Sequence, residues 1–580
     1  MLAGITGMGK VATNGDNGSG KDITFIVSGE DRYFSGDLSN YTGVMIFAAS
    51  PYTQHFNGVT GGSGWDLINT EGGRVSFDLM AGGKSNTLTM GELTLEAGSF
   101  TTILMDMENL NAWNGLQLNK LTIENKADVT LGQYKGVVWL DGEDGDRTVF
   151  ALGTIAAKEK NIGTDVKWHL RGIRNAKDFT VLQDADGTLY ASVTLDNTNP
   201  YARYANNANS AAGAKLLWGK NTGETVMAVD EVVYNLLGAE GAPKSQADVA
   251  EANRVLAAVA GASAAVLSQA FSADLERRLR DVRNRTTTMQ PNGDTLPDGT
   301  PTNVWLQAEN NYHKQKAEGL LPGFRTTGWG GSVGMDIAAG KSSVFGLALS
   351  AMYNDVTAHG PDSLKADMDT YYLSAYALVS DGAWRHTFLA TVGTADISTT
   401  RTVNYGPGSY TVNGDTESRG LGLMYELGYS TALDRDGDFC LQAVFNAAWR
   451  MSNVKDYTES GSDAALRVQG CNRNDVTLGL GARMQAAVGG NIWNSVGILE
   501  TRALLKTELG DRYGEAQVSF QGAGRSAKVR SSERGVVGME LGAGLTLPVT
   551  SSSSVFADFS VELWKNLVEM NAGVGLRVSF

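Results

Sequence analysis

The C-terminal end of the chain alternates strictly between apolar and polar or small side chains over its last thirteen residues. The apolar members of this run are Val568, Met570, Ala572, Val574, Leu576, Val578 and Phe580. A period of two places alternate side chains on opposite faces of a β-strand. Ordinary strands have about five or six residues. A longer strand with one apolar and one polar face is typical of a transmembrane β-barrel, in which the apolar face contacts lipid.

The same two-face pattern recurs through the C-terminal half of the chain and predicts an antiparallel transmembrane barrel of twelve strands. The expected strands are 303–313, 325–339, 342–356, 367–380, 383–400, 417–433, 438–453, 473–489, 494–510, 530–547, 553–564 and 567–580. Around Glu500 the alternation changes phase, so we expect a β-bulge there.

The connections between these strands differ in length from one rim to the other. Those after the even-numbered strands are short, for example Ala339-Gly340-Lys341, Asp434-Arg435-Asp436-Gly437, Gly489-Gly490-Asn491 and Thr550 to Ser553. Those after strands one, three, five, seven and nine are long and polar. Short periplasmic turns and long outer loops are the outer-membrane pattern, which places both ends of the barrel on the periplasmic side.

Residues 246–285 show the clear helical pattern of the chain, with dense Ala and apolar side chains at helix spacing. Gly261 is a candidate break in this helix. Its C-terminal end is strongly basic and carries Arg277, Arg278, Arg280, Arg283 and Arg285.

The basic end of this helix allows two interpretations. In a solvated linker, the arginines would favour the C-terminal end of the helix dipole. In a helix inside the barrel, they would face luminal carboxylates, for which the candidates are Glu309, Asp336, Glu426, Glu540, Glu562 and Glu569. Arginines are costly in an apolar core, whereas a lumen offers water and acidic partners. We therefore predict that residues 277–285 lie in the periplasmic half of the barrel and plug it.

The first part of the chain contains many short β-rich pieces that Gly, Asn and Asp separate. Examples are 23–27, 75–77, 93–95, 121–123, 129–131 and 179–181. Irregular short strands with such turns favour a right-handed parallel β-helix over a β-sandwich. The expected fold is therefore all-β: a β-helical segment over 1–200, a linker over 201–300 with a pore-spanning α-helix at about 246–285, and the barrel over 301–580.

The net charge and the hydropathy of the chain limit the classes of function that it can have. The formal net charge of −15 argues against a nucleic-acid partner, which calls for a basic surface. The chain has no apolar run of about eighteen residues, so no transmembrane helix is expected. Residues 1–11 lack the apolar core of a signal peptide, and because a protein of the outer membrane must be exported, we expect this chain to be a fragment of a longer one.

Candidate catalytic and metal-binding residues are sparse. Residues 330–334 match G-x-S-x-G but lie within an expected strand rather than at a strand-turn-helix elbow. The five His residues are scattered without metal spacing. Cys440 and Cys471 should lie a membrane thickness apart, beyond the roughly 7 Å Cα separation that a disulfide tolerates. We expect no catalytic site, no metal or other cofactor, and no disulfide.

In this order of segments the chain resembles the C-terminal part of an autotransporter, a type V secretion protein. The resemblance rests on the rung-like stretch 33–43, the phrase Leu182-Gln183-Asp184-Ala185-Asp186-Gly187-Thr188-Leu189-Tyr190, the barrel opening at 303–306 with 328–331, and the ending at 575–580. It implies a β-helical passenger displayed at the cell surface by a barrel in the outer-membrane lipid bilayer. It also implies that Leu576, Val578 and Phe580 form a signal read by the barrel assembly machinery.

One feature departs from the family. Some members cleave the passenger at an Asn-Asn pair inside the pore, and that place here holds Ala273-Asp274. We therefore expect a passenger that stays attached and acts as an adhesin, with a host or cell-surface ligand, or as a structural stalk. The alternative is a soluble secreted enzyme or carbohydrate-binding protein with an all-β C-terminal domain.

Overall fold

The computed structural model describes residues 22–80, 87–105, 115–133, 145, 147–151, 155–173, 175–183, 189–195, 199, 201–218, 224–237, 245–287, 302–339, 342–406, 408–434, 439–489, 496–521, 525–550 and 552–580. The chain divides into two compact units. The first comprises Met1–Thr198 with Gly219–Met227, and the second comprises Asn199–Trp218 with Ala228–Phe580.

Short parallel strands form most of the first unit. They are β1 (Ile23–Phe25), β2 (Arg32–Phe34), β3 (Asp37–Leu38), β4 (Gly43–Phe47), β5 (Gln54–Asn57), β6 (Thr60–Gly61), β7 (Trp65–Asn69), β8 (Arg74–Asp78), β9 (Leu88–Leu95), β10 (Phe100–Met105), β11 (Leu116–Ile123), β12 (Asp128–Gln133), β14 (Ile155–Ile162) and β15 (Lys167–Arg171). Twelve of them build two six-stranded sheets, β1-β4-β7-β9-β11-β14 and β15-β12-β10-β8-β5-β2, and β3 pairs with β6 in a two-stranded sheet. The chain coils from one sheet to the other, and within each sheet the strands pair in parallel. The predicted parallel β-helix is confirmed, and the β-sandwich is wrong.

The interior of this β-helix is apolar. Alternate strand residues point inward and stack from coil to coil, as Leu67, Leu93 and Leu121 do in neighbouring strands. Trp65, Leu67 and Phe77 are fully buried in the resulting core. An antiparallel sheet of β13 (Arg147–Ala151), β17 (Leu189–Leu195) and β16 (Ala176–Gln183) contributes Leu189 and Val193 to the same core. Residues 184–188 of the phrase at 182–190 lie outside the described residues.

The helices are more numerous than the sequence pattern indicated. They are α1 (Ala208–Leu217), α2 (Glu224–Leu237), α3 (Gln246–Val259) and α4 (Val266–Thr287), with 3₁₀ turns at Ala202–Tyr204 and Ala262–Ala265. The expected single helix at 246–285 is broken at Gly261, whose φ of 67° is left-handed, and its two parts are bent by 55°. Among the described residues, no single helix is long and apolar enough to cross a membrane, and only this bent pair reaches that length and composition jointly.

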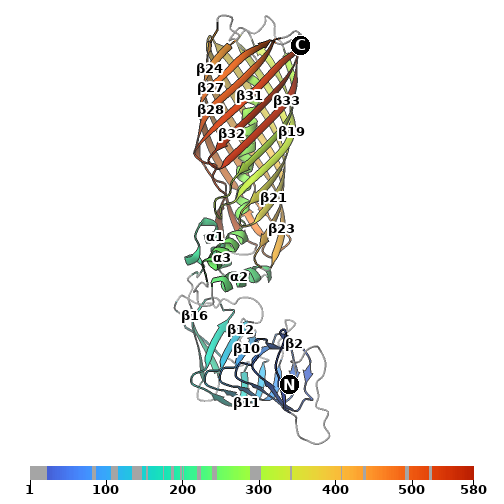
Figure 1. The fold of residues 1–580 in the computed structure, drawn as a ribbon, viewed down its shortest axis with the longest axis vertical. Coiled ribbons are helices and arrows are strands. Elements are labelled where there is room, and N and C mark those ends of the chain that lie inside the picture. Colours follow the sequence, from blue (N-terminus) through green and yellow to red (C-terminus); the bar gives the residue numbers. More distant parts are fainter. Residues whose placement is uncertain are drawn as a thin grey trace. The chain divides into compact units, whose positions relative to one another are not determined.

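A closed antiparallel barrel of twelve strands follows (Figure 1). Its strands are β18 (Thr302–Gln315), β19 (Gly323–Ala339), β20 (Ser343–His359), β21 (Ser363–Asp381), β22 (Trp384–Asn404), β23 (Ser409–Ala432), β24 (Phe439–Val454), β27 (Cys471–Gly489), β28 (Val496–Gly510), β31 (Val537–Thr550), β32 (Ser553–Trp564) and β33 (Leu567–Ser579). β33 closes the barrel by pairing with β18. The prediction of twelve strands is confirmed.

Three details of the strand prediction were wrong. The loops expected near 357–366 and 401–416 are mostly strand, because hairpins with polar outer faces extend beyond the apolar belt. The strand expected from 530 begins at Val537, and the preceding residues join a four-stranded sheet of β25 (Tyr457–Thr458), β26 (Leu466–Gln469), β29 (Glu515–Phe520) and β30 (Ala527–Arg530). β28 pairs without interruption through Glu500, so no bulge lies there. The apparent phase change arises because Leu504 is an apolar residue on the inward face.

The turns at Gly340-Lys341, 435–437, 490–491 and 551 lie outside the described residues. Cys440 and Cys471 are both free thiols, as expected. Cys440 pairs with Gln485 at one end of the β24–β27 ladder and Cys471 pairs with Val454 at the other.

Candidate functional site

Helix α4 runs inside the barrel (Figure 1). Strand alternation makes much of the lumen polar, since many inward residues of the strands are charged, amide or hydroxyl side chains while the outward residues are mostly apolar. A smaller inward cluster, which includes Trp305 and Leu389, is apolar. The five predicted arginines are all buried there, each no more than 2% exposed. A buried guanidinium needs partners to offset its lost hydration.

Arg277 and Arg278 bind the strand that opens the barrel. Glu309 of β18 lies 3.4 Å from Arg277 Nη1 and 3.1 Å from Arg278 Nη1. Arg278 also donates to the hydroxyl of Ser332 at 2.8 Å, and this hydroxyl donates to Glu309. Ser332 is the serine of the G-x-S-x-G match, and here it lies mid-strand in β19 as part of the ion-pair network.

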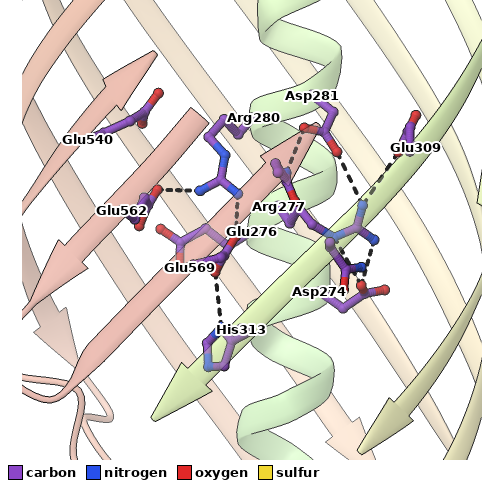
Figure 2. A network of polar contacts seen from close by, with 12 residues as sticks. Asp274, Glu276, Arg277, Arg280, Asp281, Glu309, His313, Glu540, Glu562 and Glu569 are labelled. Carbon is purple, nitrogen blue, oxygen red and sulfur yellow. Dashed lines mark hydrogen bonds and ion pairs between the residues drawn. The ribbon is translucent and has the colours of Figure 1, made fainter. Parts of the chain in front are cut away.

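Arg280 binds the last two strands. Its guanidinium forms ion pairs with Glu562 of β32 and Glu569 of β33 (Figure 2). Glu569 in turn lies 3.0 Å from Nδ1 of His313 in β18. Asn571 of β33 also donates to Asp281 of the helix at 3.0 Å. Since Glu309 of β18 binds Arg278, the helix contacts both strands of the closing β18–β33 ladder.

Arg283 and Arg285 occupy the end of the basic turn. Arg283 pairs with Glu540 of β31 and lies 3.6 Å from Glu426 of β23. Arg285 stacks over the ring of Phe556, with 3.9 Å from Cζ to the ring centroid. A cation over an aromatic face is an attractive contact when both are shielded from water.

Asp336 is the one candidate acidic partner that the structure assigns elsewhere. It accepts a hydrogen bond from the hydroxyl of Tyr376 and lies 4.0 Å from Arg577 of β33. Asp336 sits near the end of β19 at Ala339, and its neighbours across the sheet, rather than the helix, supply the positive charge. Its expected role as a helix partner was wrong.

The sequence reasoning missed a second half of the network, in which the helix supplies the acid and the wall supplies the base. Glu276 of α4 lies 3.3 Å from Arg450, 3.1 Å from Lys506 and 2.6 Å from Arg534. Arg450 and Lys506 stand at inward positions of their strands, so strand parity could have identified them. Arg534 precedes β31 in a loop and carried no such signal.

Asp274, which follows Ala273 in α4, has its carboxylate fully engaged. Its carboxylate lies 2.6 Å from Arg277 Nη2 and accepts a 2.6 Å bond from the hydroxyl of Tyr372. Thr370 donates to it at 3.2 Å. These three partners fix the carboxylate against the β21 wall.

The bend before α4 is held by the outer end of the barrel. Asp362, in the connection between β20 and β21, accepts bonds from the backbone and the hydroxyl of Ser263 at 3.1 and 2.6 Å. Burial raises the pKa of Asp362 to about 6. A side chain at Gly261 would meet Leu466 at 2.5 Å. Glu459 pairs with Arg401 beside this bend.

Helix α1 is anchored to the same end of the barrel. Asn209 donates to the carbonyls of Leu320 and Arg530 at 3.0 and 2.8 Å and accepts from the backbone of Arg530 at 2.7 Å. α1 begins at a capping box of Asn207 and Ser210, which satisfies its free N–H groups. Gly213 packs directly on the backbone of Leu256 in α3.

The predicted assembly signal lies at the other end. Leu576 and Phe580 are exposed by 44% and 78%, and Val578 pairs with Val304. The backbone N–H of Phe580 donates to the carbonyl of Thr302, so the last residue borders the first strand of the barrel.

Comparison with known proteins places the barrel in a family. A model of the autotransporter β-domain matches residues 304–560. An extracellular serine protease of Serratia marcescens is 22% identical over 535 residues, a match that covers 89% of this chain and 48% of that protein. The chain thus spans about half the length of this relative.

Solved barrels resemble the chain at low identity. The translocator domain of the autotransporter NalP from Neisseria meningitidis is 14% identical, with 54% of this chain and 98% of that chain covered and a TM-score of 0.43. The transport unit of the autotransporter AIDA-I from Escherichia coli is 16% identical, with 48% and 90% covered and a TM-score of 0.36. By the match of residues 304–560 and the closed barrel of twelve strands, the C-terminal part of this chain is an autotransporter β-domain, the translocator barrel of a bacterial outer membrane.

Proposed function

We propose that this chain displays its β-helical segment on the cell surface and keeps it attached to the barrel. The supporting observation is α4, which fills the lumen and is bound there by arginine–carboxylate pairs to β18, β31, β32 and β33. Asp274 is bound by Arg277 and Tyr372 beside Ala273, where some family members carry an Asn-Asn pair. The alternative of a soluble secreted protein is wrong for the C-terminal half, which is an outer-membrane β-domain.

Retention can be tested on intact cells. We expect a blot against the barrel to show the full-length chain in the membrane fraction, and protease added outside to shorten it to barrel size. An unproteolysed culture that already shows the barrel-sized fragment would contradict retention. Cells opened at the periplasm before digestion control for chains that never reached the surface.

We propose that the β-helical segment acts as an adhesive or structural element rather than as an enzyme. His55 lies 3.6 Å from Asp31, and His169 lies 3.2 Å from Asp128. Within the described part of the first unit, no hydroxyl bonds to either imidazole, as a serine nucleophile would require. The relative from Serratia marcescens is named a serine protease, so labelling with a serine-directed fluorophosphonate is the direct test. Covalent labelling of the β-helical segment would contradict the proposal.

We propose that the end of β33 is the signal by which the barrel assembly machinery selects this chain. Phe580 is exposed and adjoins Thr302, so its ring is accessible at the strand where the barrel must close. Deleting Phe580 should sharply lower outer-membrane levels and increase periplasmic degradation. Phe388→Ser is the matched control, since Phe388 is a lipid-facing aromatic within β22, exposed by 49%. Equal losses in the two variants would show that the position of Phe580 has no special role.

A further inference from the structure

The lipid-facing surface of the barrel is hollowed by a groove of about 840 Å³ across β18 to β23. Cross-strand pairing places its apolar floor in one row, which consists of Leu306, Val333, Leu349, Leu373 and Val392. The next row consists of Gly331, Ala351, Tyr371, Thr394 and Arg419. The members of both rows alternate with inward residues and therefore point away from the lumen.

Small residues create the hollow. Gly331 and Ala351 adjoin each other across β19 and β20, between the larger Trp329 and Leu349. A Cβ at Gly331 would come within 3.1 Å of the carbonyl oxygen of Gln307, so a larger side chain here would press on β18 as well as fill the groove. The outer surface is recessed here by the missing side-chain volume.

The two ends of the groove differ in chemistry. At one end, Leu306 and Leu349 are exposed by 61% and 58% to the surroundings of the barrel. At the other end lie Tyr371, Thr394 and Arg419. Strands in such barrels are tilted by about 35–45°, so a row of cross-strand neighbours changes depth along its length.

The sequence of β23 shows the depth of the Arg419 end. Outward residues from Leu421 onward toward the periplasm are apolar, whereas Glu417 and Asp415 on the other side of Arg419 are acidic. Arg419 therefore stands at the boundary between lipid and outer water. The apolar end of the groove is level with acyl chains, and its polar end is level with headgroups.

Arg419 is the charge that this end offers to a ligand. Its side chain is 66% exposed, and its Nη2 lies 3.5 Å from Glu417. Lys455 holds the same carboxylate oxygen at 2.5 Å. Glu417 is thus neutralised mainly by Lys455, which leaves the positive charge of Arg419 directed at the groove.

We propose that this groove is a binding site for a phosphate-bearing lipid of the outer leaflet. One acyl chain lies along the row from Leu306 to Val392, and the phosphate binds Arg419 with the hydroxyl of Tyr371 nearby. Guanidinium groups bind phosphate through paired, charge-assisted hydrogen bonds. The combination of an apolar channel and one cation at its outer end fits an anionic amphiphile better than it fits the flat apolar face of a second barrel.

The test measures the lipid that stays with the protein. The full chain is extracted from outer membranes in mild detergent, and native mass spectrometry counts bound phospholipid or phosphorylated glycolipid. Arg419→Ala should lower the retained lipid by about tenfold or more, as loss of a charge-assisted contact predicts. Ala351→Trp should lower it independently by filling the groove. Arg325→Ala is the matched control, because Arg325 is another exposed cation on the outer face but lies outside the groove.

The outcomes separate the occupants. Retention that falls in Arg419→Ala and Ala351→Trp but not in Arg325→Ala supports the lipid site. Equal retention in all four proteins overturns it. A dimer that carries no lipid and dissociates in Ala351→Trp also overturns it, because the occupant is then a second copy of the chain. Heat-modifiable mobility on a gel shows that each variant has a folded barrel.

Discussion

The β-helical segment and the barrel place opposite kinds of side chain at their inward strand positions. In the β-helix, Leu67 and Leu93 point inward and are fully buried. In the barrel, Arg483 and Glu540 point inward and are buried, while Leu480 points outward and is 66% exposed. The same period of two therefore produces an apolar core in one unit and a charged core in the other, because water surrounds the first and lipid surrounds the second.

The two interiors are stabilised differently. Apolar stacking in the β-helix stabilises the fold because it removes apolar surface from water. Each buried side chain contributes to the folding free energy nearly independently of the others. In the lumen, each charge depends on its partners, because a buried ion without one loses its hydration uncompensated. Lys506, for example, lies near Glu276, Glu540 and Glu562 together. The destabilising effect of a mutation should therefore stay local in the β-helix, whereas in the lumen it should extend to several charged partners.

The largest expected effect comes from reversing the charge of the helix end. Changing Arg277, Arg278, Arg280, Arg283 and Arg285 to Glu sets five new carboxylates against the acidic wall, so the helix should leave the lumen. Single-channel conductance in planar bilayers should rise well above that of the parent protein. An unchanged conductance would contradict the plug, as would cysteines at 278 and 283 in the parent that label as fast as those on an exposed loop. Arg325→Glu, at an exposed position of β19 on the outer face, controls for surface charge.

Neutralising a single luminal carboxylate should have the next largest effect, on the stability of the barrel. Glu540→Gln leaves Arg283, Arg502 and Lys506 short of a shared partner. Breaking a buried ion pair from one side costs about 3–5 kcal/mol of folding free energy. Urea titration followed by gel mobility should show the loss. Glu417→Gln removes an exposed carboxylate and should leave the midpoint unchanged, so equal shifts in the two variants would refute the distinction.

Truncating an apolar side chain should also affect the two units differently. Leu93→Ala leaves a cavity in the β-helix core and should cost about 2–5 kcal/mol. Leu480→Ala changes a lipid-facing position, where acyl chains fill the vacated space, and should cost about 0.5 kcal/mol. Urea-dependent proteolysis of the β-helix and gel mobility of the barrel report the two values. A cost for Leu480→Ala as large as that for Leu93→Ala would mean that the barrel, too, depends on outward packing.

An effect smaller than that of Leu93→Ala is expected at the bend between α3 and α4. Gly261→Ala places a side chain at left-handed φ, which costs about 1–2 kcal/mol, and also against Leu466. Gly382→Ala is the control, since Gly382 has φ 57° with open space around it. Faster protease cleavage near residue 261 in the first variant than in the parent is the measure. If both variants destabilise the protein equally, the contact with Leu466 contributes nothing.

How far the sequence predicts this molecule depends on which physical signal a segment carries. Strand alternation extends over every barrel strand, so the twelve strands and the partners Glu309, Glu426 and Glu540 could be predicted from it. Helix α1 has ten residues and is held by docking, as when Asn209 binds the backbone of Arg530, so periodicity alone did not identify it. Helix α2 was also missed, although it has as many residues as α3. Asp336 was misassigned because parity gives the face of a residue but not its level along the lumen.

The contacts of α4 with the first and last strands have a mechanical consequence. A barrel is closed by the pairing of its first and last strands, here the β18–β33 ladder, which we call the seam. These two strands are the pair at which we expect the barrel to open. Glu309 stands on one side of the seam, Glu569 and Asn571 stand on the other, and all three bind the same helix from within. The helix therefore links the two strands of the seam from inside, in addition to blocking the lumen. A barrel emptied of its helix should open first at this ladder, and lateral strain on the membrane should be borne by the guanidinium groups of Arg278 and Arg280.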